Sequence, residues 1–173
     1  MIRAAFAASL ALVLAACASA PAPKSASAES HPEARAYDVR PDAAGDVDAA
    51  LSRAAANGKR VLLVMGANWC HDSRALAGWL ETPRFVALVA EHYELVFVNV
   101  GMPQSGDGHN LDIARRFGLT EFPGTPALLV LTPEGKAVNR DTAASWRNAA
   151  TRSGDAIYAE LAALAEALAT PEA

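Results

Sequence analysis

The stretch at residues 59–76, KRVLLVMGANWCHDSRAL, constrains the fold more than any other part of the chain. Its near-continuous apolar run at 61–65 predicts a strand that is buried on both faces. The run ends at Gly66, and after Trp69 and Cys70 the sequence takes on helical spacing. A thiol at such a strand-to-helix turn lies at the positive end of the helix dipole, where free backbone N–H groups favour thiolate over thiol. Cys70 is therefore the strongest candidate for chemistry, and we expect its sulfur to be exposed where the chain turns out of the sheet.

The segment Trp69-Cys70-His71-Asp72-Ser73 resembles the W-C-x-x-C active site of thioredoxin-family proteins, with serine in place of the second cysteine. In that family the first cysteine attacks a substrate disulfide, and the second cysteine resolves the mixed disulfide. The resemblance implies that Cys70 is the nucleophile, that Trp69 lies on the substrate-facing rim, and that His71 and Ser73 surround the thiol. His71 either stabilises the thiolate as a cation or is an exposed histidine of little influence. Ser73 cannot resolve a mixed disulfide.

A second match lies at Thr125-Pro126, directly before an apolar run. It resembles the cis-proline that faces the active-site cysteine in thioredoxin-like folds and leaves backbone groups free to pair with an extended substrate. Pro123 is the alternative for this position. The family also carries a buried aspartate six residues before the first cysteine, where this chain has Val64. The resemblance therefore implies that Thr125 and Pro126 bind substrate, and that the aspartate is missing as well as the second thiol.

The resemblance covers roughly residues 46–168 and implies a thioredoxin-like α/β fold. In this fold helices flank a central mixed β-sheet, and here one extra helix comes first. Residues 101–109 have the composition of a loop. Periodicity and turn signals predict strands at 60–65, 94–100, 127–131 and 137–140, and helices opening at 46, after 70, at 83, at 111 and from 143 onward, most clearly over 155–168.

The N-terminus explains the other cysteine. Arg3 precedes an apolar stretch at residues 4–16, which is too short to span a bilayer comfortably and predicts a signal peptide. The stretch ends in LAAC, which resembles a bacterial lipobox and implies that Cys17 is lipidated and becomes the first mature residue. Because Ala18 is not aspartate, the resemblance further implies an anchor in the outer membrane facing the periplasm. An ordinary signal peptide cleaved near residues 18–20 is the alternative.

We divide the chain into a lipoprotein signal peptide at residues 1–16, a lipidated N-terminus with a flexible tether at 17–40, and a thioredoxin-like domain at 41–173. The tether is rich in Ala, Ser and Pro and has no apolar period. His31 lies within it and is interpreted as a solvated linker histidine rather than a metal ligand. With 173 residues, 52% of them hydrophobic, the chain has enough apolar surface for one domain with a core.

Charge and cysteine content limit the partners. The formal net charge is -4 and no block of lysine or arginine occurs, which argues against a nucleic-acid surface. With Cys17 lipidated, the mature chain has one free thiol, and in an oxidising compartment such a thiol invites intermolecular pairing. We expect the partners to be a thiol- or disulfide-containing protein or glutathione, together with the membrane through the lipid on Cys17. No cofactor is expected.

Four interpretations of Cys70 remain open. In the first, it forms mixed disulfides that an external thiol resolves, because one cysteine suffices for exchange. In the second, the domain has lost turnover and binds a partner chain beside Pro126. In the third, Cys70 and His71 bind copper or zinc with His109 or Met102, although these residues lack the usual ligand spacing, so no metal site is expected. In the fourth, Cys70 is a buried structural cysteine.

Overall fold

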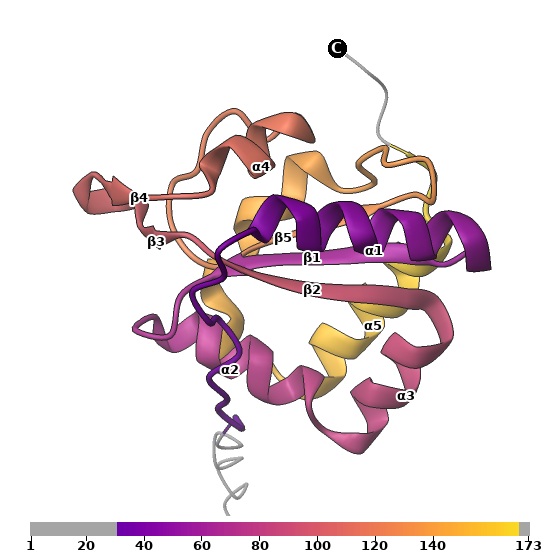
Figure 1. Cartoon of the computed structure of the whole chain (residues 1–173). Helices are drawn as coiled ribbons and strands as arrows, with labels where there is room; N and C mark the ends of the chain where they lie inside the picture. Colours follow the sequence, from indigo (N-terminus) through magenta and orange to yellow (C-terminus); the bar gives the residue numbers. More distant parts are fainter. Residues whose placement is uncertain (1–30, 170–173) are drawn as a thin grey trace, which may run out of the picture.

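A computed structural model describes residues 31–169 and has a three-stranded mixed sheet at its centre (Figure 1). The sheet has the strand order β2-β1-β5. The central strand β1 (Arg60–Gly66) runs parallel to β2 (Tyr93–Asn99) and antiparallel to β5 (Ala127–Leu131). All three strands coincide, within one residue at each end, with apolar runs from which the sequence predicted them. The predicted mixed α/β architecture is therefore confirmed.

Helices cover both faces of the sheet (Figure 1). The N-terminal helix α1 (Ala43–Asn57) packs against one face, together with α4 (Leu111–Arg116). The other face is covered by α2 (His71–Leu80), α3 (Pro83–His92) and α5 (Gly154–Glu166). The extra N-terminal helix was predicted from the sequence and is confirmed.

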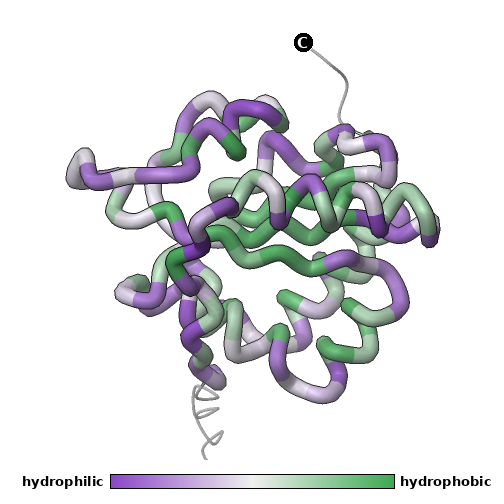
Figure 2. Tube along the Cα trace, viewed as in Figure 1, coloured by the Kyte–Doolittle hydropathy of each residue, from purple (hydrophilic) through white to green (hydrophobic). Residues whose placement is uncertain are grey.

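The central strand explains why its sequence is apolar at every position. Val61, Leu63 and Met65 face the cluster under α1, whereas Leu62 and Val64 face the cluster under α2 and α5, because side chains alternate along a strand. All five are fully buried. Figure 2 shows the strands as a continuous hydrophobic band between more polar helices. The prediction of a strand buried on both faces is confirmed.

The predicted strand at 137–140 is wrong. Only an isolated bridge joins Ala137 to Leu131, and Arg140 begins a 3₁₀ helix, η2 (Arg140–Thr151). The cause is Asn139, whose side chain takes up backbone groups of β5 that a longer neighbouring strand would have paired. Its Oδ1 accepts from the N–H of Val130 at 2.8 Å, and its Nδ2 donates to the carbonyl of residue 128 at 2.9 Å.

The segment expected to be a loop at 101–109 contains a short hairpin. Its two strands are β3 (Gly101–Met102) and β4 (Asp107–Gly108), which are antiparallel and joined through a 3₁₀ turn, η1 (Pro103–Ser105). The hairpin extends from the end of the sheet at which β1 and β2 finish (Figure 1). This is also the end of the sheet at which Cys70 lies.

Residues 31–37 pack on the domain, so the flexible tether predicted at 17–40 does not extend through this part of the chain. The backbone N–H of Ala34 donates to the carbonyl of Arg74 at 3.0 Å, and Tyr37 is 1% exposed. The segment can cross α2 because Gly78 has no side chain: a Cβ there would come 2.4 Å from the backbone of Pro32. We call residues 31–37 the N-terminal strap.

The predicted signal peptide and the lipidation site Cys17 lie outside the described residues. Within residues 31–169, no helix is both long enough and apolar enough to cross a bilayer.

Candidate active site

Cys70 is the residue that directly precedes α2, at the N-cap position. A tight turn brings it there from the end of β1, and its backbone N–H donates to the carbonyl of Ala67 at 3.0 Å. Its own carbonyl accepts the first helical hydrogen bond, from Arg74 N at 3.0 Å. The thiol therefore lies at the positive end of α2, as the strand-to-helix pattern predicted, where the helix dipole favours an anion.

The thiol itself is buried, which corrects the expectation of an exposed sulfur. Cys70 is 8% exposed, and its Sγ donates to the carbonyl oxygen of Thr125 at 3.3 Å. The Thr125–Pro126 peptide bond is cis, so Pro126 and not Pro123 occupies the predicted cis-proline position. The loop that precedes β5 thus covers the sulfur. The resemblance implied that the proline faces Cys70, but it gave no sign that the loop buries the thiol.

Ser73, one helical turn after Cys70, is also fully buried. Its hydroxyl oxygen accepts from the N–H of Ala67 at 3.4 Å, which ties the first turn of α2 to the turn that precedes it. A Cβ on Gly66 would come 2.7 Å from Ser73 Oγ and 2.6 Å from the ring of Tyr37. Glycine at the end of β1 is therefore required for this packing.

Tyr37 is a member of the site that the sequence analysis missed. Its hydroxyl donates to the carbonyl oxygen of Ser73 at 3.2 Å. Its backbone N–H donates to Asn68 Oδ1, and its backbone carbonyl accepts from Asn68 Nδ2. Burial raises the pKa of Tyr37 far above its usual range, and the nearby charge of Cys70 raises it further. Tyr37 is therefore a neutral hydroxyl that holds the strap against the first turn of α2.

Trp69 lies at the surface beside the thiol. It is 48% exposed, and its indole Nε1 donates to the carbonyl of Gly101 at 2.9 Å, so the β3–β4 hairpin fixes its orientation. Met102, the next residue of the hairpin, is 40% exposed. Trp69, which directly precedes Cys70, therefore offers exposed apolar surface beside the thiol, and the hairpin that holds it exposes Met102. The position of Trp69 on a substrate-facing rim stays a prediction.

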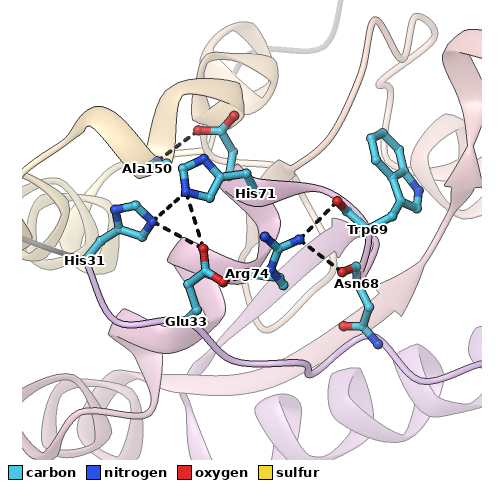
Figure 3. Close-up of polar contacts among 8 residues, drawn as sticks. His31, Glu33, Asn68, Trp69, His71, Arg74 and Ala150 are labelled. Atoms are coloured by element: carbon cyan, nitrogen blue, oxygen red, sulfur yellow. Dashed lines mark hydrogen bonds and ion pairs between the residues drawn. The ribbon is translucent and has the colours of Figure 1, made fainter.

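The two residues between Cys70 and Ser73 contact other elements with their side chains. Asp72 Oδ1 accepts from the backbone N–H of Ala150 at 2.9 Å and so links α2 to η2. The His71 side chain is 57% exposed, and its Nε2 lies 2.8 Å from Nε2 of His31 (Figure 3).

The metal interpretation built on Cys70, His71 and His109 finds no support in the geometry. Among residues 31–169, the group of histidine, cysteine and acidic side chains close enough to share an ion is His31, Glu33 and His71, and it contains neither Cys70 nor His109. The interpretation of His31 as a solvated linker histidine is wrong, because its side chain is only 18% exposed and contacts His71.

Comparisons with known proteins agree with this architecture. A family described as Thioredoxin-like matches residues 42–133. The chain is also similar to the crystal structure of a disulphide isomerase from Xylella fastidiosa Temecula1, with 34% sequence identity and a TM-score of 0.69. The match covers 77% of this chain and 98% of that one. No curated protein matches the chain significantly. The family match spans the strand, the turn with Cys70 and the cis-proline loop together, and the chain therefore belongs to the thioredoxin-like family.

Proposed function

We propose that the protein carries out thiol-disulfide exchange through Cys70 as a single active-site thiol. The observation that supports this most directly is the placement of Cys70 Sγ, at the N-terminus of α2 and 3.3 Å from the carbonyl of Thr125 beside Pro126. The similarity to a solved structure described as a disulphide isomerase favours the same chemistry. Exposed Trp69 next to the thiol offers a surface on which a substrate chain can pack.

The reaction we propose has two exchange steps. The Cys70 thiolate attacks one sulfur of a substrate disulfide, forms a mixed disulfide with it, and displaces the other sulfur as a thiolate. A thiol from outside the domain, on glutathione or on a protein, then attacks the mixed disulfide and releases Cys70 as a thiolate. The proton of Cys70 passes to the displaced thiolate or to water. Each step breaks one S–S bond and forms another, so disulfides are rearranged without net oxidation or reduction.

An external thiol is required because the first turn of α2 has no second one. Ser73 occupies the position of the resolving cysteine, and fully buried Val64 occupies that of the family's aspartate. Within residues 31–169, Cys70 is the one cysteine. These features suit exchange or isomerisation of disulfides rather than net reduction by a dithiol.

We further propose that the protein acts at the bacterial cell envelope, anchored to the outer membrane by lipid on Cys17 and facing the periplasm. This proposal rests on the LAAC motif and on the preceding apolar stretch. An oxidising compartment of this kind supplies the disulfides on which a single thiol could act.

Incubation with oxidised glutathione tests the exchange chemistry. The full chain with Cys17→Ser should gain one glutathione adduct on Cys70, detected by intact-protein and peptide mass spectrometry, and reduced glutathione should release it. Cys70→Ser in the same background should gain none. Trp69→Ala keeps the thiol and should slow only the reaction with a protein disulfide. A chain that never forms the adduct while native would contradict the proposal.

A second candidate function is a non-catalytic module that binds a partner chain beside Pro126. The low exposure of Cys70, 8%, favours it, because a covered sulfur reacts slowly. Recovery of bound partners with the Cys70→Ser variant separates the two candidates. A binding module would still retain its peptide or protein without the thiol, whereas an exchange protein would lose its covalent complex.

A further inference from the structure

Three side chains gather beside the active-site turn, and the exchange chemistry does not use them as a group. His31 Nε2 lies 2.8 Å from His71 Nε2, and Glu33 Oε1 lies 3.5 Å from the first nitrogen and 3.3 Å from the second (Figure 3). The N-terminal strap contributes His31 and Glu33, and the first residue of α2 contributes His71. Forty positions along the chain separate the two histidines.

The three donor atoms have the spacing of metal ligands. Ligand atoms about 2.0–2.1 Å from Zn²⁺, at tetrahedral angles, lie about 3.3–3.4 Å from one another. The two oxygen-to-nitrogen distances, 3.3 and 3.5 Å, match this edge, and the nitrogen-to-nitrogen distance of 2.8 Å needs only a small opening. Two imidazoles and a carboxylate form a donor set that zinc accepts when its fourth position stays open.

The carboxylate of Glu33 is held in the orientation that such a site needs. Arg74 Nε donates to Glu33 Oε2 at 3.0 Å, which leaves Oε1 directed at both imidazoles. Hydrogen bonds of this kind orient metal ligands. Arg74 is in turn fixed by the carbonyl of Trp69 at 3.0 Å. The positive charge of Arg74 also repels a cation, so a divalent ion binds more weakly here than at a carboxylate without a cationic partner.

The cluster is open to solvent on one side. The side chains of His31, Glu33 and His71 are 18%, 41% and 57% exposed. A cleft of about 730 Å³ borders His31, and Pro32 and Trp79 also line it. An ion can therefore enter the cluster, and a water or a donor group of a partner can complete its coordination.

We propose that His31, Glu33 and His71 form a binding site for a divalent transition metal, with Zn²⁺ as the reference ion. The bound ion joins the N-terminal strap to the first turn of α2, one residue after Cys70. The site is independent of the sulfur, because Cys70 contributes no ligand to it.

Calorimetric titration with Zn²⁺ tests the site. The full chain carries Cys17→Ser and Cys70→Ser, so that no thiolate competes for the metal. We expect one ion per chain, and we expect His31→Ala and Glu33→Gln each to weaken binding by about tenfold or more. His92→Ala is the matched control, since His92 lies 3.8 and 4.0 Å from two carboxylates but has no second imidazole beside it. It should leave the affinity unchanged.

Gly78→Ala tests the geometry without removing a donor atom. The added Cβ meets the backbone of Pro32 and displaces the strap from α2. Zn²⁺ affinity should fall, whereas metal binding by an isolated exposed His71 would not change. Unchanged affinity in either Gly78→Ala or His31→Ala would overturn the proposal.

A measurement that keeps all four histidines guards against misfolded variants. In ¹⁵N spectra of the histidine rings, substoichiometric Zn²⁺ should shift the signals of His31 and His71 together and leave those of His92 and His109 in place. Equal shifts at all four rings, or no shift at any, would also overturn the proposal.

Discussion

Cys70 is placed by contacts from three separate parts of the chain. The turn after β1 positions its backbone through Ala67, the cis-proline loop covers its sulfur through Thr125, and the helix that it precedes supplies the dipole. Ser73 and Tyr37 are both buried beside this turn, and the hydroxyl of Tyr37 donates a hydrogen bond to the backbone carbonyl of Ser73. Together these contacts leave a thiol with very little exposed surface, beside the exposed ring of a tryptophan.

Ser73→Cys should restore an intramolecular disulfide with Cys70. Cys70 precedes α2 and residue 73 lies three positions later in its first turn, so a thiol at position 73 can reach the Cys70 sulfur. In the full chain with Cys17→Ser, air oxidation should consume both free thiols, and the oxidised and reduced forms should interconvert with dithiothreitol. Insulin reduction should appear as well. Ser73→Ala is the control and should do neither. Persistent free thiols in native Ser73→Cys would show that the side chains diverge.

Tyr37→Phe and Tyr37→Ala separate the hydroxyl from the ring. Loss of the hydroxyl removes one hydrogen bond and should lower the free energy of unfolding by about 1 kcal/mol. Loss of the buried ring should lower it by about 3 kcal/mol or more, because a cavity remains. Urea unfolding measures both values. Val39→Ala, at a residue that is 80% exposed, should change the free energy by less than about 0.5 kcal/mol. A native-like stability of Tyr37→Ala would mean that the strap does not pack in solution.

At the level of elements, most of the segments that build the site contact α2. The strap crosses it at Gly78 and bonds to the carbonyl of Arg74, and η2 attaches to its first turn through Asp72. The opposite side of the sheet is organised differently. There α1 is joined to the start of β2 by Glu94, which accepts from Arg53 Nε and from Asn57 Nδ2, each at 2.7 Å.

Glu94→Gln should make stability depend less on pH. The hydrogen bond from Arg53 lowers the pKa of Glu94 in the folded state, so the carboxylate stabilises the fold above its unfolded pKa of about 4.5. This contribution is lost as the pH falls through the lower folded pKa. At pH 7, Glu94→Gln should lower the free energy of unfolding by up to about 1 kcal/mol. Urea titrations at a series of pH values should show the difference vanishing in acid.

The exposed residue Glu121 provides the control for this series. Glu121→Gln should change the free energy of unfolding by less than about 0.5 kcal/mol at every pH. A difference between Glu94→Gln and the natural chain that persists unchanged in acid would contradict an electrostatic origin.

Elements that depend on local pattern were predictable from the sequence. The strands β1, β2 and β5 are apolar runs, and the position of Cys70 follows from a turn and a helix that are contiguous with it. The strand expected at 137–140 failed because one side chain, that of Asn139, pairs with β5 in place of a backbone. Its apolar residues Ala137 and Val138 are typical of a short strand and gave no sign of this bond.

Contacts between distant segments were not predictable from local pattern, and the one between Cys70 and the Thr125–Pro126 loop was expected only from the family resemblance. The strap has the composition of a linker, and its docking depends on the burial of Tyr37 and on the absence of a side chain at Gly78. Because the strap was expected to be solvated, His31 and Glu33 could not be related to His71. The low exposure of Cys70 has the same origin, since Thr125 covers it from 55 positions away.

On the scale of the whole molecule, one end of the sheet carries all of the candidate chemistry. The thiol lies there against the cis-proline loop, and the exposed Trp69 is held by Gly101. The β3–β4 hairpin extends from the same end of the sheet (Figure 1). The His31, Glu33 and His71 cluster lies one residue further along α2. In the proposed exchange, Cys70 has no second thiol within residues 31–169 to release its adducts, so it should hold each mixed disulfide until an external thiol arrives.

The most direct test is to trap that adduct in cells that export the protein. Rapid acid quenching followed by mass spectrometry should find Cys70 in disulfide linkage with glutathione or with a cysteine of another protein. The linked fraction should be larger before treatment with a reductant and absent from the Cys70→Ser variant. Recovery of Cys70 only as an unmodified thiol, under conditions in which other exported cysteines are linked, would contradict exchange through this residue.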